Sequence, residues 1–153
     1  TTAAKLNNMA MAREFCSVLQ EAGYKTWVYG SPSKLRRVFD YDQIASLYGI
    51  WLARYRWSDT VLQFNDEATR KMVKETGYEG GSWTGLTNVE MWQYTERGRV
   101  SGISGNVDLD LGYAPDCWGI DVSAHQGTIN WKRVKEDGVE FAMLRITQKY
   151  KEQ

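Results

Sequence analysis

The sequence is poor in the residues on which metal, disulfide and histidine-based sites depend. Its 153 residues include two cysteines, one histidine and two prolines. Cys16 and Cys117 are too few for a disulfide framework and lack metal-ligand spacing, although spacing alone leaves a single bridge between them open. The one histidine, His125, has no partners for a catalytic triad, and no metal-ligand cluster surrounds it. We therefore expect no metal and no cofactor.

An excess of positive charge and a long apolar run are also absent. Lysine and arginine number 19, as do aspartate and glutamate, whereas nucleic acid and anionic membranes attract basic proteins. No apolar run approaches the roughly 20 residues of a membrane-spanning helix, and no charged-then-apolar signal segment opens the sequence. We expect neither nucleic acid nor membrane as a partner, while secretion of a mature chain stays compatible with the sequence.

Aromatic residues are plentiful instead, with seven Trp and nine Tyr. Most of them are expected to fill the core. Flat rings also bury the apolar faces of sugars while their N–H or O–H groups stay hydrogen-bonded, so several are expected to line a sugar cleft.

Hydrophobic periodicity and turn residues predict alternating helices and strands. Thr1 or Thr2 caps the first helix, Gly23 ends it, and Cys16 falls on its apolar stripe. Helices are expected at 2–22, 33–39 (capped by Ser33), from Asn65 or Asp66 to Thr76, and 131–137, and a glycine-marked loop follows Thr76. Strands are expected at 25–29, 48–55, 89–95, 99–103 after a turn at 96–98, 107–111, 118–122 and 141–146.

The expected strands are mostly continuous apolar runs, which indicates a parallel sheet covered by helices on both faces. The fold class is therefore α/β, a (β/α) barrel or part of one. In such a barrel the chemistry gathers at the C-terminal ends of the strands. Those ends are Gly30, Arg54–Tyr55, Tyr94–Thr95, Asp108–Asp110, Asp121–Ser123 and Arg145–Thr147.

Several long segments resemble one enzyme family, the glycoside hydrolase family 25 lysozymes. GIDVSAHQGTINW and VKEDGVEFAMLRIT resemble its opening strand, loop, helix and second strand, and MWQYTERGRVSGISGNVDLDL resembles its closing strands. AREFCSVLQEAGYKTWVYG and YGIWLARY resemble its later helix and central strands. The resemblance implies a secreted or wall-associated muramidase that cleaves the β-1,4 bond between N-acetylmuramic acid and N-acetylglucosamine in bacterial peptidoglycan.

The order of these segments departs from the family. The late strands occupy residues 1–111, a link follows at 112–117, the early strands occupy 118–146, and a polar tail runs from 147 to 153. We expect one domain over 1–153, a permuted or partial barrel with about six of the eight strands. A short link suits neighbouring first and last strands of a closed barrel; domain swapping between copies is the alternative.

Two family strands have no counterpart. One carries a Tyr-His-Phe-like segment, and the other carries Asp-x-Glu, whose Glu is the family's proposed general acid. The family also has an acidic residue after the Thr of LRIT, where this chain has Gln148. Hydrolysis by this chain is therefore expected to be impaired.

The resemblance assigns the catalytic carboxylates to Asp121 in GIDVS and Asp108 in NVDLD. If their strands are neighbours, like-charge repulsion raises one pKa and keeps a proton near neutral pH. Without the resemblance, each is an ordinary turn or capping residue. Asp110, which alternates with Asp108, is a further substrate-binding candidate. The alternative is that it caps a turn or faces solvent.

The other substrate-binding candidates are Gln93 and Tyr94 in WQYT, Trp51 and Arg145, with barrel packing as the alternative for each. Gln93 and Tyr94 are expected to bond N-acetyl groups, and Trp92 then points into the core because strand neighbours alternate. Arg145 lies in an expected buried strand and needs a partner, for which Asp121 is suitable. His125 is expected to be exposed, with a sugar contact as the alternative.

Three functions are open at this point. The first is a peptidoglycan hydrolase. The second is a non-catalytic module that keeps the cleft and binds glycan. The third is an engineered or truncated fragment whose open strand edges drive copies to associate.

Overall fold

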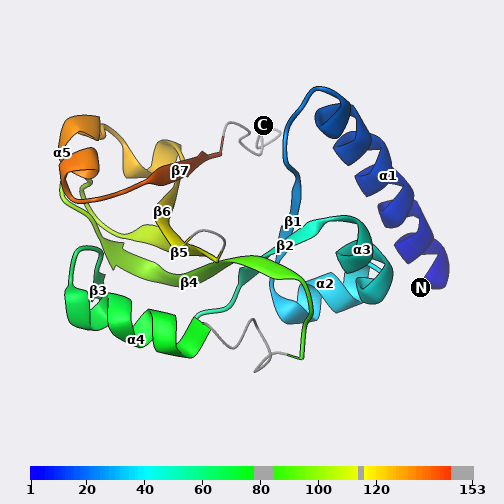
Figure 1. The fold of residues 1–153 in the computed structure, drawn as a ribbon, viewed down its shortest axis with the longest axis horizontal. Coiled ribbons are helices and arrows are strands. Elements are labelled where there is room, and N and C mark those ends of the chain that lie inside the picture. The colour runs from blue at the N-terminus through cyan, green and yellow to red at the C-terminus, as the bar shows by residue number, and fades with distance from the viewer. Residues whose placement is uncertain (78–84, 114–115, 146–153) are drawn as a thin grey trace, which may run out of the picture. The chain divides into compact units, whose positions relative to one another are not determined.

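Helices and strands alternate along the chain, and hydrogen bonds join the strands into a mixed sheet (Figure 1). The computed structural model describes residues 1–77, 85–113 and 116–145. Within them the sheet order is β1-β2-β4-β5-β6-β7, and β3 pairs with β4. The elements are α1 (Thr2–Glu21), β1 (Trp27–Gly30), α2 (Pro32–Val38), α3 (Tyr41–Leu47), β2 (Gly49–Ala53), β3 (Leu62–Gln63), α4 (Glu67–Gly77), β4 (Val89–Arg99), β5 (Val107–Tyr113), β6 (Asp116–Val122), α5 (Trp131–Glu136) and β7 (Phe141–Leu144).

The chain divides into two compact units. The first contains residues 1–54 and 77–92, and the second contains residues 55–76 and those from Gln93 onward. The strand β4 passes from one unit into the other at Trp92 and Gln93. The expected link at 112–117 lies within the second unit.

The expected helices form, with small changes at their caps. Thr1 caps α1, its Oγ1 accepting from the Ala4 amide at 3.4 Å, and Cys16 is buried as its position on the stripe predicts. Asp66 accepts from the Thr69 amide at 2.7 Å and starts α4. Ser31, and not Ser33, caps α2, because Pro32 takes the first helical position, where its missing N–H costs nothing.

The predicted turn at 96–98 and strand at 99–103 are wrong, because β4 runs unbroken to Arg99. Gly98 suggested a turn, but in the strand it makes room for a side chain: a Cβ there would lie 2.3 Å from the Leu109 side chain. The chain turns only afterwards, where the Ile103 amide donates to the Val100 carbonyl and Gly102 adopts a positive φ. The helix α3 and the strand β3 were not predicted from the sequence.

The sheet is mixed, so the prediction of a wholly parallel sheet is wrong. The pairs β1–β2, β3–β4 and β6–β7 are parallel, but β5–β6 is antiparallel. Few residues separate β5 from β6, and only an antiparallel hairpin can be closed by so short a connection. The alternation of polar and apolar residues in VDLDL fits such a strand.

In the first unit, α1, α2 and α3 supply apolar side chains to a core with β1, β2 and the start of β4. Three long-range hydrogen bonds fix the segment before β4: Tyr41 Oη donates to the Thr87 carbonyl at 2.6 Å, and Asn88 Nδ2 donates to the carbonyls of Ala45 and Tyr48. Core side chains in this unit include Met9, Leu35, Ile44, Ile50, Leu52 and Trp92.

In the second unit, α4 lies beside the strands (Figure 1) and covers one face through Arg70 and Val73. The Arg70 guanidinium lies 5.1 Å from the centre of the Trp118 ring, and Val73 is fully buried. Lys74 pairs with Asp116 at 2.9 Å at the start of β6. The helix therefore covers one face of the β4–β6 region. Polar side chains of β4, β5 and β6 lie on the other face.

Three further observations concern the described residues only. None of their helices is long and apolar enough to cross a membrane. No group of three His, Cys, Asp or Glu side chains among them is placed to hold a metal ion. Cys16 and Cys117 are both free thiols.

Candidate active site

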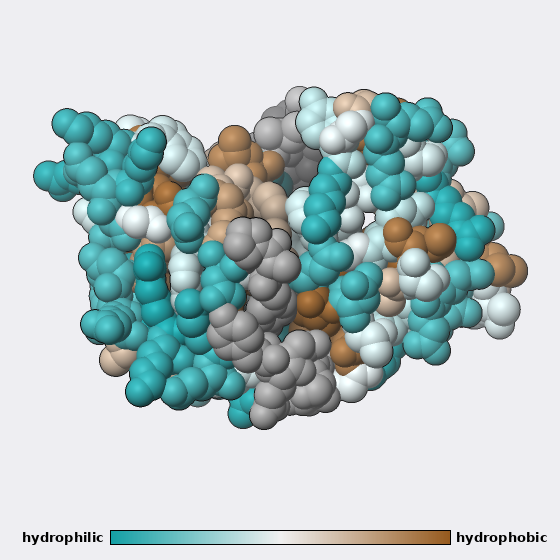
Figure 2. Space-filling model, viewed as in Figure 1, coloured by the Kyte–Doolittle hydropathy of each residue, from teal (hydrophilic) through white to brown (hydrophobic). Residues whose placement is uncertain are grey.

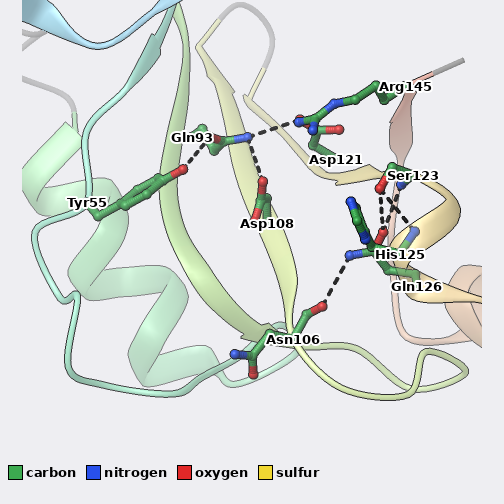
Figure 3. A network of polar contacts seen from close by, with 9 residues as sticks. All are labelled: Tyr55, Gln93, Asn106, Asp108, Asp121, Ser123, His125, Gln126 and Arg145. Carbon is green, nitrogen blue, oxygen red and sulfur yellow. Dashed lines mark hydrogen bonds and ion pairs between the residues drawn. The ribbon is translucent and has the colours of Figure 1, made fainter. Parts of the chain in front are cut away.

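The β5–β6 hairpin places Asp108 and Asp121 directly opposite one another. Their Cα atoms are partners in the antiparallel register, in which Leu109 faces Ile120 and Asp110 faces Gly119. Because side chains of directly opposed residues lie on the same face of a sheet, the two carboxylates point the same way (Figure 3). The expected juxtaposition of the two carboxylates is thus present within one unit.

Gln93 bridges the two carboxylates from β4 (Figure 3). Its Nε2 donates to Asp108 Oδ2 at 3.4 Å and to Asp121 Oδ2 at 3.3 Å. Its Oε1 accepts from the Tyr55 hydroxyl at 2.8 Å. The Gln93 side chain is fully buried and its amide donates to both carboxylates; the expected contact to an N-acetyl group stays a prediction.

Arg145 pairs with Asp121, as predicted, through Nη2 and Oδ2 at 3.9 Å. Its side chain is 54% exposed, so the expectation that it is buried is wrong. Arg145 follows the last residue of β7, where the strand ends and the long side chain can reach water. The pair therefore brings a solvated positive charge to the edge of the site.

Burial and mutual repulsion shape the protonation of the carboxyls. The pKa of Asp108 is raised from 3.8 to about 6, first by burial and then by the charges of Asp121 and Glu96, while Arg145 opposes the rise. Burial also raises the pKa of Asp121, against the lowering effects of Arg145 and of the hydrogen bond from Gln93. Asp108 therefore holds its proton in mildly acidic solution, next to a carboxylate with two stabilising partners.

Asp110, Tyr94 and Trp51 are the remaining substrate-binding candidates. Asp110 is fully buried on the same strand as Asp108. Tyr94 is fully buried as well, with its ring edge-on to Trp118 at 6.1 Å between centres, and burial raises its pKa. Trp51 belongs to the first unit, where its ring packs on Tyr29 at 4.6 Å. Trp92 is buried in the core as expected, and its Nε1 donates to the Arg54 carbonyl.

A second polar network orders the loop after β6 (Figure 3). Ser123 caps a short 3-10 turn over Ala124–Gln126, and Gln126 Oε1 accepts from the Ser123 amide at 2.8 Å. Gln126 Nε2 in turn donates to the Asn106 carbonyl at 3.3 Å, just before β5. His125 is exposed on this turn. The network ties the loop beyond Asp121 to the start of the strand that carries Asp108.

A cavity of about 230 Å³ opens at the ends of β6 and β7. Arg145, which pairs with Asp121, lines it, and half-exposed Trp131 supplies an aromatic surface. Its other lining residues are Val122, Ser123, Gly127, Ile129 and Leu144. The predicted positions Ile146, Thr147 and Gln148 lie outside the described residues.

Tyr55 is a site residue that the sequence did not predict by its chemical type. The signal that located it was its position, because it follows the strand of YGIWLARY and strand ends gather at one rim. Its hydrogen bond to Gln93 depends on residues 38 positions apart, a separation that strand pattern alone does not specify.

Comparison with known proteins gives one match. The sequence model of the family described as glycosyl hydrolases family 25 matches residues 1–103. No curated protein matches the chain, and no solved structure does. The matched residues include Gln93 and end before Asp108 and Asp121.

Proposed function

Because the chain belongs to glycosyl hydrolases family 25, we propose that it acts on bacterial peptidoglycan and that Asp108 and Asp121 are its catalytic carboxyls. The bond is the β-1,4 linkage between N-acetylmuramic acid and N-acetylglucosamine. The observation that carries this proposal is the pair of opposed aspartates bridged by Gln93, with the pKa of Asp108 raised to about 6. Family 25 enzymes are glycoside hydrolases, and such enzymes use a pair of carboxyl groups at the scissile bond.

The two carboxyls suit different steps. Protonated Asp108 gives its proton to the oxygen of the leaving sugar as the glycosidic bond breaks. Ionised Asp121, stabilised by Arg145 and Gln93, faces the positive charge that develops at the anomeric carbon. Water then adds to that carbon and returns a proton to Asp108, which balances the reaction.

Hydrolysis is expected to be slow because the sequence contains no Asp-x-Glu motif. In the family that the chain resembles, the Glu of this motif is the proposed general acid. Loss of a general acid typically lowers a rate by about 10²–10⁴-fold. Asp108 supplies a proton only in mildly acidic solution, so the remaining activity should decline as the pH rises through about 6.

Release of reducing ends from purified peptidoglycan, measured between pH 4 and 8, tests the proposal. We expect slow release that is greatest in mild acid and is lost in Asp108→Asn and in Asp121→Asn, while the exposed Asp59→Asn control retains it. Both site variants should also change glycan affinity. Unchanged glycan affinity in both would contradict the site assignment, and clearing of cell walls at a rate typical of the family would contradict the impairment.

A glycan-binding module without hydrolysis is the second candidate. The cavity beside Arg145, with its exposed Trp131 ring, favours binding because an aromatic surface next to a cation can take an apolar sugar substituent and a nearby carboxylate. Binding of peptidoglycan fragments with no release of reducing ends at any pH would favour this function.

The permuted order and a location outside the cell are further proposals. The antiparallel β5–β6 hairpin supports the permuted order, since it joins the segment that resembles the family's closing strands to the one that resembles its opening strand. Action on peptidoglycan requires the chain to reach the cell wall, which supports secretion or wall association.

We also propose that copies of the chain associate through α1. Met11, Phe15 and Val18 are 63%, 68% and 59% exposed, and with Glu14 they line an open apolar groove. Figure 2 shows hydrophobic patches among the hydrophilic side chains over this helix. Their spacing of four and three residues is the spacing of a helix–helix seam.

A second copy of α1, running antiparallel, is the occupant that the charges favour. The first turn of α1 contains no acidic residue and its last turn no basic one, whereas Lys5 and Glu21 stand at those ends with the sign that opposes the helix dipole. An antiparallel copy brings each Glu21 to the Lys5 end of its partner and so compensates both ends. Domain swapping is the competing mode of association.

A further inference from the structure

Gln93 is an unusual group to lie between two catalytic carboxyls, because it can neither donate a proton in catalysis nor attack a sugar. It is fully buried in β4, so it does not reach solvent. A buried amide needs hydrogen-bond partners on both its oxygen and its nitrogen. In this site the oxygen meets one hydroxyl and the nitrogen meets two carboxylates.

The two carboxylates and the Tyr55 hydroxyl together set which way the amide faces. A side-chain amide fits the same space in two orientations that exchange its oxygen and nitrogen. With Tyr55 donating to Oε1 at 2.8 Å, the NH₂ group faces Asp108 and Asp121. The reversed amide would place its oxygen against two carboxylates, which accept hydrogen bonds and cannot donate while ionised.

The two contacts of the NH₂ group are long, at 3.4 Å to Asp108 and 3.3 Å to Asp121, whereas the contact to Tyr55 is short. Each amide hydrogen serves one carboxylate. An amide without the Tyr55 anchor could tilt toward either aspartate and shorten one bond at the cost of the other. The short bond thus keeps the amide between both.

We propose that Gln93 is a positioning residue that holds the Asp108 and Asp121 carboxylates in one shared arrangement, and that Tyr55 orients it. This inference rests on the proposed function only in naming those carboxyls as catalytic. Gln93 acts through these carboxyls, to which its amide nitrogen donates.

Titration of the aspartate carboxyls by ¹³C NMR in Tyr55→Phe tests the proposal without any glycan. Removing the hydroxyl removes one hydrogen bond that orients the amide, so we expect the pKa of Asp121 to rise by about one unit and that of Asp108 to change as well. Gln93→Leu, which removes the donor altogether, should raise the pKa of Asp121 further. Tyr24→Phe, at an exposed tyrosine of the first unit, should leave both values unchanged.

Hydrolysis provides a second measurement. Tyr55→Phe should lower kcat by about tenfold with KM nearly unchanged, since the carboxyls are misplaced while glycan contacts remain. Titration curves of Tyr55→Phe that match those of the unsubstituted protein would overturn the proposal, even if Gln93→Leu does not fold. Failure of the unsubstituted protein to bind or cleave peptidoglycan would instead overturn the proposed function, and the titration would still decide the role of Gln93.

Discussion

At the scale of single residues, the site contains carboxyls whose environment favours the neutral form. Most aspartates in folded proteins gain partners that lower the pKa. Asp108 and Asp121 are both raised instead, with burial as the largest cause. Arg145 and Gln93 limit the rise at Asp121 without reversing it. The ionised forms of these two carboxyls are therefore disfavoured in the folded chain, and such perturbed groups are common at functional sites.

Stability should therefore depend on the charge of Asp108. Its pKa is 3.8 when unperturbed and about 6 in the folded chain, so the folded state binds this proton more tightly. The resulting stabilisation is complete below about pH 4 and is lost as the pH rises through about 6. Asp108→Asn cannot ionise, so its free energy of unfolding relative to the unsubstituted protein should increase by about 1–3 kcal/mol between pH 4 and pH 8.

Urea unfolding at a series of pH values measures this difference. Asp59→Asn, at an exposed turn, serves as the control and should show a difference that does not vary in this way. A pH-independent difference for Asp108→Asn would show that the Asp108 carboxyl titrates at its ordinary pKa.

At the scale of the elements, the strands β6 and β7 pack closely at a glycine of β6, over which an aromatic ring of β7 lies. Gly119 is the register partner of Phe141, and a Cβ at Gly119 would lie 2.3 Å from ring atoms of Phe141. Gly119 also faces Asp110 across the hairpin. The close approach of this ring keeps β7, and with it Arg145, next to the strand of Asp121.

Gly119→Ala should therefore destabilise the chain by about 1–3 kcal/mol through overpacking. In a Phe141→Leu background the ring is gone, and the same substitution should cost clearly less. Urea unfolding of the two single variants and the double variant measures the coupling. Equal costs of Gly119→Ala in both backgrounds would mean that the Phe141 ring is not what excludes a side chain.

The sequence predicted most elements, because the helices carry capping residues and apolar stripes that act locally. It failed at Gly98, whose role is set by Leu109 of another strand, and at β5–β6, whose antiparallel pairing follows from the short connection. Opposition of Asp108 and Asp121 was predictable once their strands were taken as neighbours. Burial of Gln93 and the Tyr55 contact were not, since they depend on three-dimensional packing.

At the scale of the whole molecule, the proposed association surface and the proposed catalytic site lie on different parts of the chain. The family match covers residues 1–103, and the strands that follow it continue the sheet from β4 through β5 and β6 to β7. The apolar groove on α1 belongs to the first unit, and the carboxylate pair belongs to the second. The proposed association and the proposed catalysis can therefore be tested by separate substitutions.

Phe15→Glu should weaken self-association by about tenfold or more, because burial of a phenylalanine side chain contributes about 1.5–3 kcal/mol. Sedimentation equilibrium over a range of protein concentrations measures the dissociation constant. Tyr24→Glu, an equally exposed aromatic position beyond the end of α1, is the control. A chain that stays monomeric at all concentrations, or a Phe15→Glu variant that associates as before, would contradict the role of α1.

The antiparallel pairing of β5 with β6 makes spacing along the chain a determinant of the chemistry. Register partners run from Asp108 and Asp121 to Tyr113 and Asp116. One residue inserted between Asp108 and Tyr113 would turn the Asp108 carboxylate to the opposite face of the sheet, away from Gln93. Residues added between Tyr113 and Asp116 would lie beyond the last pair and leave the carboxylates opposed, so natural length variation should be tolerated at the tip of this hairpin and excluded from its arms.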